Sequence, residues 1–152
     1  MNLRDKVELD LKKALKLGDA TVVSTLRFLL SAIKYREIEL MSKPSLDDAG
    51  VVEVIAKQVK SHKESIEAFK KGNRPELVEK EESELKILES YLPIQLNEVE
   101  VRQIVSDLIN QMKKDSQPLE FGSVMKQAMG KLKGQVEGNV VKKVVEEILK
   151  EG

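Results

Sequence analysis

The chain contains neither cysteine nor tryptophan, and only five of its 152 residues are aromatic. Without cysteine, disulfides, thiolate metal sites and a cysteine nucleophile are excluded. The hydrophobic residues, 41% of the chain, must therefore build a core mainly from Leu, Ile, Val, Met and Ala. So few aromatic side chains also argue against recognition of single-stranded nucleic acid by base stacking.

The chain also lacks an excess of either charge, with 26 basic and 26 acidic residues. The balance holds in both parts, because residues 1–92 carry 17 of each sign and residues 93–152 carry 9 of each. Bulk charge therefore gives no argument for nucleic-acid binding. No window approaches the roughly 18 apolar residues of a membrane span, and the N-terminus has no apolar signal core. These absences predict a cytoplasmic protein that does not enter a membrane.

The hydrophobic pattern predicts an all-α fold, because apolar residues recur at helical spacing and no segment alternates long enough for a strand. A first helix is expected to stop at Gly18, and a second to begin after an N-cap at Asp19. The second is expected to end before Pro44, and a third to be capped by Ser45. A fourth opens at Pro75, whose missing N–H is tolerated in a first turn. Alternating spacings of three and four form a seam on the third helix: Val52, Ile55, Val59, His62, Ile66 and Phe69.

Pro93 is the predicted boundary between two small helical domains, since it disfavours helix at the preceding residue and donates no backbone hydrogen bond. Residues 1–92 are predicted to form an N-terminal domain of about four helices, and residues 93–152 a three-helix tail domain. Asn97 is the expected N-cap of the first tail helix. The last two tail helices are rich in glycine, with Gly130, Gly134 and Gly138 expected to join helix to helix.

No set of residues in the sequence predicts catalysis. His62 is the only histidine, and a lone histidine on an apolar stripe is most simply a hydrogen-bonded packing residue. A zinc site there would have only carboxylates beside it, which zinc rarely accepts. No serine lies in a nucleophile elbow, and no glycine cluster follows a strand. We therefore predict no catalytic residue, no metal and no cofactor. Four acidic residues of the fourth helix are expected on a solvated face: Glu79, Glu81, Glu82 and Glu84.

Residues 122–145 differ from the rest of the chain, because they hold five lysines against one acidic residue, Glu137. Lysines close to a helix N-terminus are suited to contacts with phosphate. The predicted anion site consists of the loop between the last two helices and the backbone N–H groups from Gly138 to Val141. On charge alone, the simpler interpretation is that these lysines only keep a small pair of helices in solution.

Two motifs resemble the GatB/YqeY family. The first is Tyr91-Leu-Pro-Ile-Gln-Leu96, followed by an acidic helix start. The second combines Gly122-Ser-Val-Met-Lys126 with Lys131-Leu-Lys-Gly-Gln-Val-Glu-Gly138. The similarity extends over essentially the whole chain and is typical of a free-standing member of the family.

The resemblance implies a function in translation, because the same helical domains occur in the B subunit of glutamine-dependent tRNA amidotransferase. The family is thereby associated with amide transfer, which is a carbon–nitrogen ligase activity that uses glutamine as the amido-N-donor. The catalytic cradle of that enzyme is absent here, and only the family name suggests an independent amide-transferring enzyme. We therefore expect a non-catalytic tRNA-binding accessory module. The implied RNA contacts are Lys126, Lys131, Lys133, Lys142 and Lys143, with Gly134 and Gly138 shaping the loop.

The alternative is a protein-interaction module that docks on an amidotransferase or an aminoacyl-tRNA synthetase. An apolar surface is required for such docking. The seam on the third helix is its predicted position, provided that part of the seam is exposed.

Overall fold

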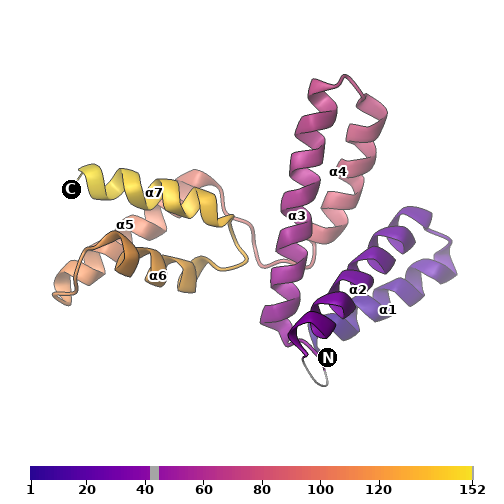
Figure 1. Cartoon of the computed structure of the whole chain (residues 1–152), viewed down its shortest axis with the longest axis horizontal. Coiled ribbons are helices and arrows are strands. Elements are labelled where there is room, and N and C mark those ends of the chain that lie inside the picture. The colour runs from indigo at the N-terminus through magenta and orange to yellow at the C-terminus, as the bar shows by residue number, and fades with distance from the viewer. Residues whose placement is uncertain (42–44, 152) are drawn as a thin grey trace. The chain divides into compact units, whose positions relative to one another are not determined.

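The computed structural model describes residues 1–41 and 45–151, and within these ranges the chain is helical with no strand (Figure 1). The all-α prediction is confirmed. No helix of the described ranges is long and apolar enough to cross a membrane. The helices are α1 (Leu3–Leu17), α2 (Ala20–Leu40), α3 (Asp48–Lys71), α4 (Pro75–Glu89), α5 (Glu98–Lys114), α6 (Phe121–Leu132) and α7 (Gly138–Glu151).

The chain divides into two compact units, an N-terminal unit of Met1–Leu92 and a C-terminal unit of Pro93–Gly152. Each unit has its own hydrophobic core. Pro93 begins the second unit, where a residue without a backbone N–H cannot continue a helix. Each unit therefore builds its hydrophobic core from its own residues.

Helices α1 to α4 pack around the core of the N-terminal unit, and α3 and α4 lie side by side over most of their length (Figure 1). Gly18 ends α1 with a left-handed backbone (φ 70°), and the Asp19 side chain accepts a hydrogen bond from the Val22 N–H, so both predicted signals are confirmed. The buried apolar side chains are Val7, Leu26, Leu29, Ile33, Leu46, Val51, Ile55, Val59 and Leu88.

The predicted start of the third helix is wrong. Ser45 does not cap it; instead Asp47 accepts a hydrogen bond from the Gly50 N–H at 2.8 Å, and α3 begins at Asp48. The reason is a tertiary contact, because the Leu46 N–H donates to the Glu37 carboxylate at 2.8 Å. Pro44, the expected limit of the second helix, lies outside the described residues.

Partly buried polar contacts join the helices of the N-terminal unit. The Glu37 carboxylate is 8% exposed and pairs with Arg4 of α1 at 2.5 Å. The Tyr91 hydroxyl donates to Asp10 at 2.6 Å, joining the chain after α4 to α1. Burial and, secondarily, Asp10 raise the pKa of Tyr91 above its usual range. These partners offset the free-energy cost of removing polar and charged groups from water.

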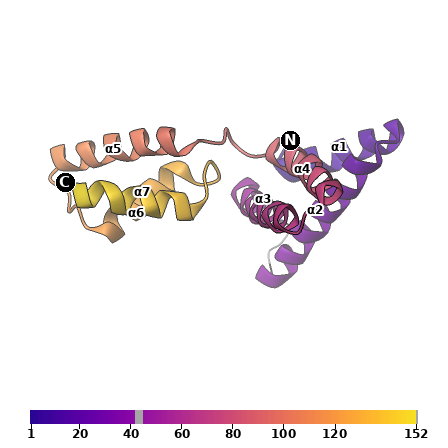
Figure 2. The same cartoon turned by 90° about the horizontal axis from the view of Figure 1, so that it is seen from above.

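Helices α5, α6 and α7 form the C-terminal unit and lie beside one another (Figure 2). Asn97 caps α5 as predicted, and its side chain and that of Glu100 form a reciprocal capping box. The core is entirely apolar and dominated by valine. Its buried members are Val101, Val105, Leu108, Ile109, Met112, Val124, Ala128, Leu132, Val141, Val144 and Val145.

Candidate functional site

The two sequence motifs meet in the C-terminal unit. The Gln95 side-chain amide donates to the Gly134 carbonyl at 2.7 Å, and the Leu96 N–H donates to the Gln135 carbonyl at 2.9 Å. Gly134 has φ +80°, a backbone conformation that glycine adopts without steric cost. The segment that follows Pro93 therefore holds the loop between α6 and α7, and Gly134 shapes that loop.

The five lysines of the candidate RNA surface are all exposed, but their electrostatic surroundings differ. Lys143 pairs with Glu98 at 3.3 Å, and Lys133 also has an interaction partner within the chain. The described residues provide no ion-pair partner for the three others, Lys126, Lys131 and Lys142. These three keep their charge available to an external anion.

Gly130 lies inside α6, so the expectation that it joins two helices is wrong. It follows Lys126 by one helical turn and directly precedes Lys131, and it is exposed. A Cβ atom built at Gly130 meets nothing within 4 Å. Glycine inside a helix costs about 1 kcal/mol relative to alanine, and packing within the chain does not account for that cost. The helix backbone is therefore open to close approach beside these two lysines.

The expected anion site at the start of α7 is only partly available. The N–H groups of Val140 and Val141 donate to the Glu137 carbonyl at 3.1 and 3.3 Å. They close the first helical turn instead of facing solvent as free donors. Gly138 begins α7, and a Cβ atom there would make only ordinary contact with Met129 at 3.8 Å. The steric requirement for glycine in this loop falls on Gly134.

An ion-pair network that the sequence analysis missed joins α5 to α7. Arg102 hydrogen-bonds Glu147 and also lies 3.8 Å from Glu98. The hydrogen bond from Arg102 lowers the pKa of Glu147, and the same bond raises the pKa of Arg102. Spacing gave no signal for this contact, because the two residues are 45 positions apart. Glu98 of this network also pairs with Lys143 at 3.3 Å, so Lys143 is not among the lysines without an ion-pair partner.

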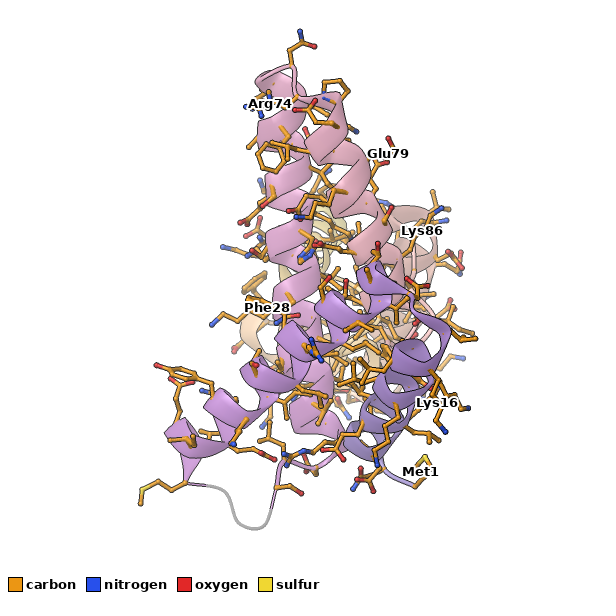
Figure 3. The ribbon with its side chains drawn as sticks, turned by 90° about the vertical axis from the view of Figure 1, so that its right-hand side faces the viewer. Met1, Lys16, Phe28, Arg74, Glu79 and Lys86 are labelled. Carbon is orange, nitrogen blue, oxygen red and sulfur yellow. The ribbon has the colours of Figure 1, made fainter. Side chains whose placement is uncertain are left out.

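The apolar seam on α3 is not the exposed surface that the docking alternative required at its centre. Ile55, Val59 and Ile66 are all buried, and the apolar residues at its ends, Val52 and Phe69, are partly accessible, as is His62. Exposed apolar side chains lie on other helices instead, and on α2 they include Phe28, Tyr35 and Ile38, which are 65–67% exposed. Phe28 projects away from the helices in Figure 3.

The acidic residues of α4 do not share one solvated face. Glu79 and Glu82 are exposed, and Glu79 points away from α3 in Figure 3. Glu81 and Glu84 are mostly buried and face His62 of α3 instead. Spacings along α4 could not distinguish the two pairs, because His62 belongs to another helix.

Fold and surface together define a class: a small all-α protein of two helical units, with free lysines on the second unit. A family model described as Yqey-like protein matches residues 4–149. The chain belongs to this family, which confirms the resemblance noted in the sequence.

Curated relatives of this chain carry the name altered inheritance of mitochondria protein 41, mitochondrial. The relative from Lachancea thermotolerans is 38% identical over 120 residues, which cover 77% of this chain and 63% of the relative. The relative from Kluyveromyces lactis is 41% identical over 129 residues, which cover 81% and 65%. That from Saccharomyces cerevisiae is 36% identical over 107 residues, covering 68% and 57%. The chain thus spans less than two thirds of each of these three relatives.

These names correct the expected location. The cytoplasmic prediction rested on the lack of an apolar signal core and of a membrane span. The relatives are named as mitochondrial proteins, and that finding overturns it.

Proposed function

We propose that this protein is a non-catalytic accessory module that binds tRNA through the phosphate backbone, related in function to glutamine-dependent tRNA amidotransferase. The observation that carries the proposal is the set of three lysines without an internal acidic partner, Lys126, Lys131 and Lys142. Two of them lie on α6 and one on α7, in the unit whose motifs resemble the tRNA-facing part of the amidotransferase family.

The chemistry of the three lysines suits phosphate. A lysine that has no internal ion pair exchanges hydration and counterions for a phosphate without first breaking another contact. Lys143 differs, since its pair with Glu98 must open before it contacts RNA. The open backbone at Gly130 lets a sugar–phosphate chain approach α6 closely between Lys126 and Lys131. Contacts of this kind position a nucleic acid without reading its sequence.

Filter binding of total tRNA over a series of salt concentrations tests the proposal. We expect binding at low salt that weakens steeply as salt rises, because each neutralised phosphate contributes about 0.7–0.9 to the slope of log K against log salt. The triple variant K126Q/K131Q/K142Q should reduce that slope by about 2–3.

The matched control is K113Q/K114Q/K150Q, which removes the same charge from three other exposed lysines of the same unit. It should retain most of the wild-type affinity and slope. No binding at low salt, or equal losses in the two triple variants, would contradict the proposal.

The exposed apolar side chains of α2 favour a second function, docking on an amidotransferase or an aminoacyl-tRNA synthetase. Phe28, Tyr35 and Ile38 lie at helical spacings of seven and three, so they share one face. Leu40, also on α2, is 49% exposed. Aromatic residues on such a face are typical anchors of protein interfaces.

Analytical ultracentrifugation with a purified amidotransferase or synthetase tests this second function. The double variant F28S/Y35S should abolish complex formation without changing the circular dichroism of the chain. The matched control is L15S/L17S, which removes two exposed apolar side chains of α1 in the same unit. If tRNA binding persists in F28S/Y35S while docking is lost, the two functions use separate surfaces.

A further inference from the structure

Three potential ligand atoms converge between α3 and α4 in the N-terminal unit. The His62 Nε2 atom lies 3.0 Å from a carboxylate oxygen of Glu84 and 3.6 Å from one of Glu81. All three ligand atoms lie within 4.8 Å of one another. Glu81 and Glu84 are three positions apart on α4, so they share the face that meets α3.

Hydrogen bonding at the other ring nitrogen orients His62 toward the two carboxylates. The Nδ1 atom lies 3.0 Å from the Gln58 backbone carbonyl, which only accepts hydrogen bonds, so Nδ1 must be the donor. In the neutral ring, Nε2 then carries a lone pair and no hydrogen. That lone pair faces two carboxylates, which also only accept. Three atoms that can each ligate a metal ion therefore converge at one point between the two helices.

We propose that His62, Glu81 and Glu84 bind a first-row divalent transition-metal ion of the zinc type. Zinc accepts imidazole nitrogen and carboxylate oxygen at about 2.0–2.2 Å, which separates tetrahedral ligand atoms by about 3.3 Å. The two separations from Nε2, 3.0 and 3.6 Å, lie on either side of that value. The Gln58 carbonyl orients the ring through Nδ1, as the partners of metal-bound histidines do.

The surroundings allow an ion to enter and to stay. The three side chains are 15–21% exposed, so solvent reaches the cluster while most of each side chain is packed. Three protein ligands leave a coordination position for water. A lone histidine with only carboxylates beside it is a ligand set that zinc rarely accepts, and this cluster is such a set. The sequence did not show that both carboxylates come from the next helix and converge on one ring nitrogen. The inference is independent of tRNA binding, which involves the other unit.

Isothermal titration of the full-length protein with Zn²⁺ tests the site. We expect one ion per chain, and a loss of affinity of more than about 100-fold in E81Q/E84Q, because replacing even outer partners of a metal site costs 10–100-fold. The matched control is E79Q/E82Q, which makes the same change at the same spacing on exposed positions of the same helix. The control should bind as the wild type does.

A second measurement needs no variant, because His62 is the only histidine of the chain. Its ring nitrogens give an unambiguous pair of NMR signals. One equivalent of Zn²⁺ should shift the Nε2 signal strongly and leave Nδ1 protonated, and Co²⁺ should produce visible d–d absorption. Unchanged ring signals at one equivalent, or equal affinity in both double variants, would overturn the proposal.

Discussion

The N-terminal unit buries polar side chains in ordered pairs, whereas the C-terminal unit surrounds an apolar core with charges that remain outside it. Both buried polar side chains of the described residues, Thr25 and Glu37, belong to the N-terminal unit. The buried residues of the C-terminal unit are all apolar. Polar and charged side chains therefore join segments of the chain inside the first unit, whereas in the second unit they lie on the surface.

The physical reason is desolvation. A charge taken out of water loses several kcal/mol unless a partner replaces the hydration. Glu37 therefore requires both Arg4 and the Leu46 N–H, and it specifies how three segments meet. Exposed lysines such as Lys126 and Lys131 keep their hydration and specify no internal contact. They are consequently the groups that remain available for a ligand.

Removing the Glu37 carboxylate should break the N-terminal unit most severely. Glu37→Ala leaves the buried Leu46 N–H without its acceptor, and leaves the Arg4 guanidinium with only Glu8, 3.7 Å away. We expect a loss of about 3 kcal/mol in the free energy of unfolding, measured by urea denaturation. Glu39→Ala, which removes an exposed partner of Arg36, should cost less than about 1 kcal/mol.

Amide hydrogen exchange of Glu37→Ala then shows whether the two units are energetically separate. Protection should fall in α1 to α4 and persist in α5 to α7, because the cores share no buried residue. Equal loss of protection in both units would mean that the two units unfold together and are not energetically separate.

Two glycines of the C-terminal unit should respond in opposite directions to the same substitution. Gly134→Ala forces a side chain into a left-handed backbone (φ +80°) and should cost about 1–2 kcal/mol. Gly130→Ala adds a methyl group in open space within a helix and should stabilise the unit by up to about 1 kcal/mol. Thermal unfolding of both variants measures the difference. Weaker tRNA binding by the more stable Gly130→Ala would show that Gly130 serves the ligand.

The smallest effect concerns pH and the exposed pair of Arg102 and Glu147. Because Arg102 lowers the pKa of Glu147 in the folded state, the pair stabilises the protein above the ordinary carboxyl value of 4.5. That stabilisation is lost as the pH falls below 4.5 and through the lowered pKa. The difference in unfolding midpoint between wild type and Arg102→Gln should therefore be present at neutral pH and shrink in acid. A difference that grew in acid would assign the stabilisation to another group.

Much of the helical framework was predictable because its signals are local. The caps at Asp19 and Asn97 act over three residues, and the stop at Gly18 requires only one left-handed residue. The start of α3 was mispredicted because Leu46 is held by a residue nine positions away. Gly130 was misplaced for another reason, since glycine is compatible with both a helix and a loop.

The candidate sites were likewise predictable only in part from the sequence. Lysine-rich composition pointed to residues 122–145, but only the folded chain separates Lys126, Lys131 and Lys142 from Lys143, whose partner Glu98 lies on another helix. Similarly, the sequence did not distinguish the four glutamates of α4, whereas in the structure Glu81 and Glu84 face His62 of α3.

The amino-acid sequence by itself determined the helical class, most of the helix limits and the family, because periodicity, caps and motifs act within a few residues. The tertiary structure alone decided which polar groups pair across long stretches of sequence. His62 meets Glu84 across 22 positions, Gln95 meets Gly134 across 39, and Tyr91 meets Asp10 across 81. Such contacts depend on how helices pack, and packing is set by the sum of many apolar contacts that no local pattern contains.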